Sequence, residues 1–340
     1  MATEDLETIA KMMVEKPKGI LAMDESDGTI GKRLKEAGLE NTEEVRRAYR
    51  QMLIAAPGLG QYISGAILFT ETLYQKTDDG TPFPNALETQ GIMPGVKVDL
   101  GLEEMPGHPG EFITKGLDGL AERLAKYREQ GAKFVKWRSV IYIDMDRGLP
   151  SPNCIEENAD RLGRYARISQ QEGLVPIVEP EVEMSGQHTI DGCYAVTTKT
   201  LAAVFDSLRY NNVKLDEMVL KPNMVVPGKD YQNGGSSPLA IADKAVKALL
   251  ENVPEDVPGI AFLSGGLSDE DATNYLNQMN AAFKDLPWNL TFSFGRVLQR
   301  EPLRIFAAKG PNYIRNAQEM LLQRAMECSL ATKGAYKPHK

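Results

Sequence analysis

Lysine side chains follow several short apolar runs of this sequence, and one of them is placed for covalent chemistry on a carbonyl group. Lys221 comes directly after Met218–Leu220 and is followed by Pro222, which indicates a position at the rim of a strand rather than on a long loop. Burial and a second nearby cation, for which Lys136 is the candidate, both favour the neutral amine. A neutral lysine is the nucleophile that forms an imine with a ketone. The alternative is a lysine that ends a strand and reaches solvent.

Carboxylates occur at comparable positions. Glu179 and Glu181 lie two residues apart, so in an extended strand both side chains point to the same side. Beside two lysines, such a pair either neutralises them in a structural ion-pair network or transfers protons. Asp24 follows another apolar run and adds a third carboxylate, although it could equally cap a helix that starts near Gly28.

Two segments have the composition of phosphate-binding sites. Ser264-Gly265-Gly266 precedes a predicted helix, whose N-terminal amides favour an anion. The pair Gly295-Arg296 ends a later apolar run. A second cluster follows the first run and consists of Ser26, Thr29, Lys32, Arg33 and, from a later run, Lys97. The residues alone therefore indicate an amine-catalysed lyase that acts on a doubly phosphorylated carbonyl compound.

Composition excludes several other classes of function. The net charge of −8 argues against nucleic-acid and anionic-membrane partners. The three cysteines show no CxxC spacing, which favours free thiols in a reducing compartment. His108, His188 and His339 are scattered, so we expect no metal. The sequence contains neither a P-loop nor a G-x-G-x-x-G motif, so we expect no organic cofactor either. The N-terminus resembles no signal peptide and no apolar run is long enough for a membrane helix. We expect a cytoplasmic protein, or a plastid one if the chain is a processed form.

Eight short apolar runs alternate with segments of helical periodicity, which predicts an α/β protein with a parallel sheet. The runs are Gly19–Met23, Ile63–Phe69, Met93–Val98, Lys133–Trp137, Leu174–Val178, Met218–Leu220, Gly259–Leu263 and Leu290–Phe294. Seven of them end in ionisable or hydroxyl groups. In a (β/α)8 TIM barrel these strand ends converge on one mouth, where catalytic residues sit.

Residues 1–340 are predicted to form one barrel domain, with a short N-terminal helix and a C-terminal helical segment that ends in a short tail. Helical stripes such as Leu201, Val204, Phe205 and Leu208 are expected to pack on the sheet. The Pro- and Gly-rich pieces Thr77–Pro84, Met105–Gly110 and Asn223–Ser237 are predicted to be loops on this scaffold.

Several motifs, taken together and in order, resemble the class I fructose-1,6-bisphosphate aldolase family from about Pro17 to about Tyr336. The motifs are Ile20-Leu21-Ala22-Met23-Asp24-Glu25-Ser26, Phe69-Thr70-Glu71-Thr72-Leu73-Tyr74-Gln75, Lys136-Trp137-Arg138, Val178-Glu179-Pro180-Glu181, Leu220-Lys221-Pro222-Asn223-Met224, Leu263-Ser264-Gly265-Gly266 and Ser293-Phe294-Gly295-Arg296.

The resemblance implies a role for each candidate residue. Lys221 would be the Schiff-base lysine, Glu179 would move protons during imine formation and C–C cleavage, and Asp24 would help to deprotonate the C4 hydroxyl. Lys136 and Glu181 would support carbinolamine chemistry and the charge network. The substrate-binding residues would be Ser264, Gly265, Gly295 and Arg296 at the C1 phosphate, Ser26, Thr29 and Lys97 at the C6 phosphate, and Arg138.

The family is usually homotetrameric and metal-independent, acts in glycolysis, gluconeogenesis or the Calvin cycle, and takes a small sugar bisphosphate as substrate. Animal relatives carry a longer tail that ends in tyrosine, whereas this sequence ends Tyr336-Lys337-Pro338-His339-Lys340. We expect Tyr336 to be an ordinary exposed residue near a frayed terminus. Two alternatives stay open: a preference for sedoheptulose 1,7-bisphosphate, and a scaffold or sensor that binds sugar phosphate without turnover.

Overall fold

A computed structural model describes residues 5–232 and 236–338 and contains a closed barrel of eight parallel strands. Going around the barrel, the strand order is β1-β10-β9-β8-β7-β6-β3-β2. The strands are β1 (Gly19–Met23), β2 (Ile63–Leu68), β3 (Met93–Lys97), β6 (Phe134–Ile141), β7 (Val175–Val182), β8 (Val219–Leu220), β9 (Gly259–Phe262) and β10 (Asn289–Phe294). The predicted TIM barrel and the location of all eight strands are confirmed.

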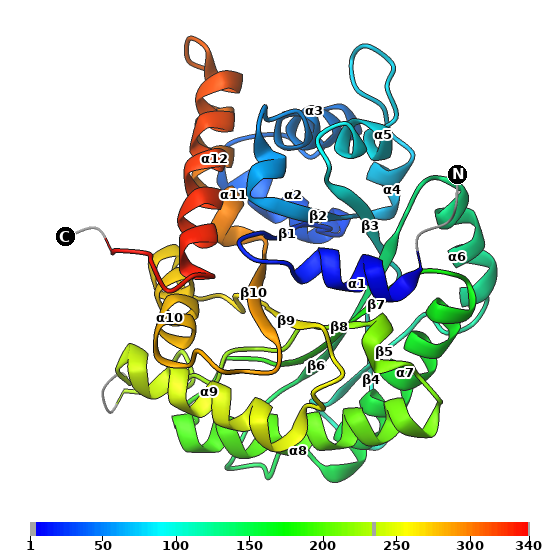
Figure 1. Ribbon diagram of the computed structural model, residues 1–340, viewed down its shortest axis with the longest axis vertical. Helices are drawn as coiled ribbons and strands as arrows, with labels where there is room; N and C mark the ends of the chain where they lie inside the picture. Colours follow the sequence, from blue (N-terminus) through cyan, green and yellow to red (C-terminus); the bar gives the residue numbers. More distant parts are fainter. Residues whose placement is uncertain (1–4, 233–235, 339–340) are drawn as a thin grey trace.

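Helices surround this barrel on the outside (Figure 1). The α-helices are α1 (Leu6–Val14), α2 (Asp27–Glu36), α3 (Glu43–Ile54), α4 (Thr70–Leu73), α5 (Phe83–Glu88), α6 (Leu120–Glu129), α7 (Pro152–Gln171), α8 (Ile190–Tyr210), α9 (Pro238–Asn252), α10 (Asp269–Ala282), α11 (Arg296–Ala308) and α12 (Tyr313–Ala331). The chain also forms two 3₁₀ turns in its described part, η1 (Leu59–Gln61) and η2 (Leu215–Glu217). None of the helices in the described part of the chain has the length and apolar composition needed to span a membrane.

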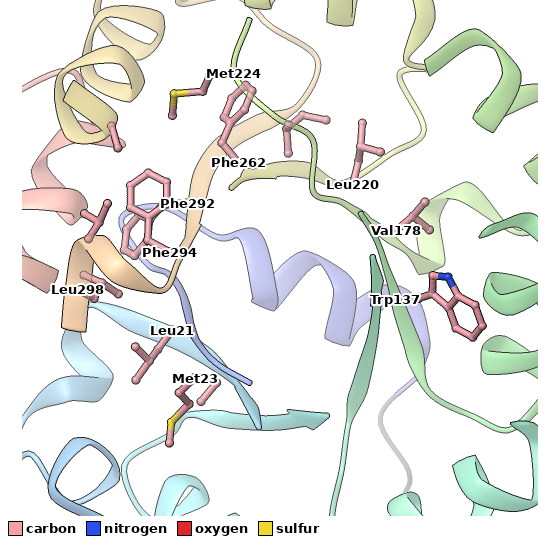
Figure 2. Packing of buried hydrophobic residues seen from close by; sticks show 14 of the residues in the cluster. Leu21, Met23, Trp137, Val178, Leu220, Met224, Phe262, Phe292, Phe294 and Leu298 are labelled. Atoms are coloured by element: carbon pink, nitrogen blue, oxygen red, sulfur yellow. The ribbon is translucent and has the colours of Figure 1, made fainter. Parts of the chain in front are cut away.

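The larger hydrophobic core lies between the barrel and its helices. Side chains at alternate strand positions, such as Leu21, Val178 and Leu220, point outward into this layer. Figure 2 shows Trp137 pointing from β6 toward the surrounding helices, where its ring lies 5.4 Å from that of Tyr165 on α7. This packing fixes the face of each strand, so the intervening residues must point into the barrel.

A second, smaller core fills the N-terminal half of the barrel interior. Inward residues such as Ile20, Phe134, Ile177 and Val219 belong to it, together with the buried face of α1. Figure 1 shows α1 crossing this end of the barrel. Since apolar side chains and α1 close this end, the opposite, C-terminal end is the one open to a ligand.

Three predicted loops have different outcomes. Thr77–Pro84 is shorter than predicted because α5 begins at Phe83, and Pro84 is tolerated in the first turn of a helix. Met105–Gly110 is the connection of a hairpin formed by β4 (Leu102–Glu104) and β5 (Phe112–Thr114), which the sequence did not reveal. Asn223–Ser237 has no regular structure where it is described, and its residues 233–235 lie outside the described residues.

Candidate active site

Charged residues occupy the inward positions in the C-terminal halves of β6 and β7. Phe134 points into the barrel core, and the same face of β6 continues with Lys136 and Arg138. On β7 the apolar Val175 and Ile177 are followed by Glu179 and Glu181. The barrel interior therefore changes from apolar to ionic along its axis.

The predicted ends of these two strands were wrong. We expected Trp137 and Val178 to be the last strand residues, but β6 continues to Ile141 and β7 to Val182. Ionisable residues are rarely buried within strands, so the sequence pattern favoured termination there. The charges are accommodated because residues from neighbouring strands neutralise one another.

Four of the candidate catalytic residues form one buried cluster. Lys136 Nζ lies 2.7 Å from Asp24 Oδ2 and 3.2 Å from Glu179 Oε2. The other oxygen of Glu179, Oε1, lies 3.1 Å from Lys221 Nζ. Glu179 thus bridges the two lysines. Lys136, Glu179 and Lys221 are each less than 5% exposed, so their charges act on one another with little screening.

Glu181 belongs to a separate pair on the same face of the barrel. Its carboxylate accepts a hydrogen bond from Arg138 Nε. The side chain of Arg138 is 41% exposed, whereas that of Glu181 is 6% exposed.

The ionisation of the cluster follows from this geometry. Burial opposes the charge of Asp24, but the positive charges of Lys136 and Lys221 outweigh it and lower the pKa of Asp24 to about 2. Burial likewise opposes the charge of Glu179, and Lys136, Lys221 and Arg138 lower its pKa below the usual value. For Lys136, burial is outweighed by Asp24 and Glu179, so its pKa is raised. Lys136 therefore remains a cation at neutral pH.

Asp24 is not a helix cap. The helix after β1 begins at Asp27, and Ser26 occupies the N-cap position. Asp24 instead directs its carboxylate to Lys136 on the other side of the barrel mouth. The capping alternative is thereby excluded.

The first predicted phosphate site lies after β9 and β10. Gly265 and Gly266 have φ angles of 52° and 98°, which side chains other than glycine adopt at a cost. A Cβ at Gly266 would also lie 3.2 Å from Arg296 Nη2, so the glycine leaves room for the guanidinium. Burial and the neighbouring Arg33 and Arg300 lower the pKa of Arg296. This concentration of positive charge favours an anion.

The second predicted phosphate site lies at the start of α2 and the end of β3. Ser26 makes no capping hydrogen bond with its side chain, and its Oγ lies 3.3 Å from Thr29 Oγ1. Lys97 Nζ contacts the carboxylate of Asp99 and also donates a hydrogen bond to the Asp99 carbonyl oxygen, 2.8 Å away. Hydroxyls, an ammonium group and a helix N-terminus together suit a phosphate.

One cavity of about 910 Å³ contains both sites and the lysine cluster. Every candidate residue lines it: Asp24, Ser26, Thr29, Lys97, Lys136, Arg138, Glu179, Glu181, Lys221, Ser264, Gly265, Gly295 and Arg296. Its volume is in the usual range for small-ligand sites.

The cavity also contains residues that the candidate set lacks. Asp99, 7% exposed, holds Lys97 and accepts a bond from the Arg138 N–H at 3.3 Å. Arg33, which the sequence already placed in the second phosphate cluster, is held by Glu25 and faces the same space. The spacing Lys97-Val98-Asp99 was a usable signal for Asp99, because residues two apart in an extended segment share a side. Leu100 and Leu102 also line the cavity, but no sequence pattern indicated that they would.

Within residues 5–232 and 236–338 we find no group of three or more histidine, cysteine or acidic side chains that could hold a metal ion. His339 lies outside these residues. The expected independence from metals stays a prediction.

The expectation for Tyr336 was wrong. Tyr336 is only 5% exposed and packs into the larger core. Its N–H donates to Asn277 Oδ1 on α10 at 2.9 Å. An aromatic ring can bury a large apolar area even near a chain end, which outweighs the tendency of termini to fray. Of the tail that follows, residues 339 and 340 lie outside the described part.

Comparison with known proteins places this arrangement in a family. The family model described as "Fructose-bisphosphate aldolase class-I", glycolytic, matches residues 5–340. The chain belongs to the class I fructose-bisphosphate aldolase family. A relative from Xanthomonas campestris, "Probable fructose-bisphosphate aldolase class 1", is 48% identical over 337 residues, covering 99% of this chain and 100% of that protein.

A plant protein and a solved structure of the same family are also similar to this chain. "Fructose-bisphosphate aldolase 6, cytosolic" from Arabidopsis thaliana is 51% identical over 320 residues, 94% of this chain and 88% of that protein. A solved aldolase from Plasmodium falciparum, in complex with TRAP and a small-molecule inhibitor, superposes with a TM-score of 0.96 at 47% identity. The match covers 98% of this chain and 95% of that one. The family resemblance inferred from the motifs is confirmed.

Proposed function

We propose that this protein reversibly cleaves fructose 1,6-bisphosphate to dihydroxyacetone phosphate and glyceraldehyde 3-phosphate through a Schiff base on Lys221. The observation that carries the proposal is the contact between Lys221 Nζ and Glu179 Oε1, 3.1 Å apart, in a cavity that has cationic and hydroxyl groups at both ends. Family membership supports the same reaction.

The first half of the reaction needs a neutral amine and a proton carrier. Glu179 is within reach of Lys221 and accepts its proton. The freed lone pair attacks the C2 carbonyl, and the resulting carbinolamine loses water to give the protonated imine. Glu179 returns the proton that the departing hydroxyl requires. Lys136 stabilises the carboxylate form of Glu179 between these steps.

The second half breaks the C3–C4 bond. The protonated imine takes up the electron pair of that bond, so no free carbanion forms. Asp24 is ionised at neutral pH and takes up the proton of the C4 hydroxyl as the aldehyde carbonyl forms at C4. Glyceraldehyde 3-phosphate leaves, the enamine is protonated at C3, and water hydrolyses the imine to release dihydroxyacetone phosphate.

The two phosphates fix the substrate across the barrel mouth. We assign the C1 phosphate to Ser264, Gly265, Gly295 and Arg296, and the C6 phosphate to Ser26, Thr29 and Lys97. Arg138, paired with Glu181, also lines this cavity. Charge-assisted hydrogen bonds to both phosphates hold the substrate so that its C2 carbonyl lies next to the Lys221 amine.

A sedoheptulose 1,7-bisphosphate aldolase is the rival enzyme, because that substrate has the same carbonyl and phosphate ends. Measuring kcat/KM for both bisphosphates tests the assignment, and we expect the higher value for fructose 1,6-bisphosphate. A higher kcat/KM for sedoheptulose 1,7-bisphosphate would show that this seven-carbon sugar is the preferred substrate. Binding of both without turnover would support the scaffold or sensor instead.

We further propose that residues 1–340 form one domain that acts as a homo-oligomer, as a tetramer, in the cytoplasm and without a metal or organic cofactor. The core that contains Leu21 also contains Tyr336, which supports the single domain. The Arabidopsis relative is described as cytosolic. The expected absence of nucleic-acid and membrane partners rests on the net charge of −8.

A further inference from the structure

The strand that carries the proposed Schiff-base lysine is unusually short. β8 consists of Val219 and Leu220 alone, and Lys221 lies immediately after it. The N–H of Lys221 still donates to the carbonyl of Val178 on β7 at 2.8 Å. Beyond that bond, no backbone pairing joins the Lys221 segment to β7 in the described structure. The backbone hydrogen bonding between β8 and β7 therefore ends at Lys221.

A proline on β7 explains why the ladder stops. In a parallel pair, the carbonyl of Lys221 would accept the next bond from residue 180 of β7. That residue is Pro180, which has no N–H. The next residue, Pro222, faces β9 instead, where its carbonyl accepts from the Leu263 N–H at 3.0 Å. Yet β7 continues for two more residues and carries Glu181, so its remaining polar groups on this side need a partner.

The side chain of Asn223 supplies that partner. Asn223 Oδ1 accepts from the N–H of Val182, the last residue of β7, at 3.1 Å. Its Nδ2 donates to Thr197 Oγ1 on α8 and to the carbonyl of Met224, both at 3.1 Å. Asn223 is 5% exposed, so these bonds are shielded from water. One amide thus joins the segment after β8 to β7 and to the helix that follows β7.

We propose that Asn223 is a positioning residue that replaces the missing ladder bond and holds Lys221 in register with Glu179. Lys221 lies two residues before Asn223, and Glu179 lies three residues before Val182. The bridge therefore fixes the relative displacement of the two segments that carry the nucleophile and its proton partner. The inference rests on the proposed role of Lys221 in imine formation.

The experiment compares Asn223→Ala with the matched control Asn280→Ala. Asn280 is also buried, at 4% exposed, and its side chain bonds to the carbonyl oxygens of Leu276 and Leu290 and to Lys16. It lies beside the start of β10, at the closed end of the barrel. Both variants lose a buried amide, but only the first lies next to Lys221.

Three quantities are measured on the folded protein: the rate at which borohydride traps dihydroxyacetone phosphate on Lys221, kcat, and KM. In Asn223→Ala we expect the trapping rate and kcat to fall roughly 10–100-fold, because misplacement of a reacting group by about 1 Å has effects of that size. KM should change less than about threefold, because the phosphate sites are untouched. Asn280→Ala should lower Tm with kcat within about twofold of the parent.

The conservative variant Asn223→Asp keeps an acceptor for Val182 and should recover most of the trapping rate. If Asn223→Ala does not fold, Asn223→Leu is used instead. Leucine fills the volume of the asparagine side chain but has no acceptor for the Val182 N–H, and the same quantities are compared with those of the parent. A trapping rate within about twofold of the parent in the folded alanine or leucine variant overturns the proposal, as does an aspartate variant as slow as alanine. Failure to trap Lys221 in the parent protein would instead overturn the proposed function.

Discussion

At the scale of single residues, the account depends on Glu179 lying between two lysines. The sequence predicted that Glu179 and Glu181 share a face, and that Lys136 and Lys221 lie near them. It could not show that Glu179 contacts both lysines while Glu181 pairs with Arg138. Those partners depend on the stagger between neighbouring strands, which no local pattern encodes.

Replacing Glu179 with glutamine tests its proton-transfer role. The amide keeps the shape but cannot exchange protons with Lys221, so kcat should fall roughly 10²–10⁴-fold. Glu183→Gln, just beyond the end of β7, is the matched control and should keep its activity. A fall of less than about threefold in Glu179→Gln would assign the proton transfer to another group, with Asp24 the next candidate.

The pH dependence of stability tests the ion pair between Asp24 and Lys136. Because the pKa of Asp24 is lowered from 3.8 to about 2, its carboxylate stabilises the fold above about pH 4 and loses that effect as the pH falls through 2. The difference in free energy of unfolding between the parent and Asp24→Asn should shrink by about 2 kcal/mol between pH 5 and 2. Chemical denaturation at several pH values measures it, and a constant difference would contradict the pair.

Arg296 tests the C1 phosphate site. Charge-assisted hydrogen bonds contribute about 1.5–3 kcal/mol, so Arg296→Ala should raise KM for the bisphosphate roughly 10–100-fold. Arg304→Ala, an exposed arginine two turns further along α11, serves as the control. An unchanged KM in Arg296→Ala would remove this residue from the site.

At the scale of elements, the sequence predicted strand positions better than strand ends. Short apolar runs locate β6 and β7, but the inward charges of Arg138 and Glu181 look like turn residues when each strand is read alone. The hairpin β4–β5 was missed because its strands are only three residues long and every residue of β4 is exposed. Tyr336 was misjudged because its partner on α10 lies 59 residues away in the sequence.

The tail therefore has a structural role that can be measured. Tyr336→Ala removes a buried aromatic ring and should lower the free energy of unfolding by about 2–4 kcal/mol. Truncation directly after Tyr336 should leave stability nearly unchanged, because Lys337 and Pro338 are exposed. In either protein, kcat of the folded form should change less than about fivefold. If the truncation destabilises the protein as much as Tyr336→Ala does, the stabilising contacts come from the residues after Tyr336 rather than from its ring.

At the scale of the whole molecule, the barrel follows from eight apolar runs and the helices between them. The sequence did not reveal that α1 closes the N-terminal end of the barrel, because an amphipathic helix does not indicate which surface it covers. That closure leaves the C-terminal mouth as the place where charges from many strands meet. All the candidate residues line one cavity because every parallel strand ends at that mouth.

The most direct measurement of the central claim is the site of covalent attachment. The protein is treated with dihydroxyacetone phosphate and borohydride, and the labelled peptide is mapped, with Lys221→Arg alongside. A guanidinium stays protonated and forms no imine, so the account predicts a label on Lys221 in the parent, and no label and no cleavage in the variant. A label on Lys136, or cleavage that survives in Lys221→Arg, would contradict it.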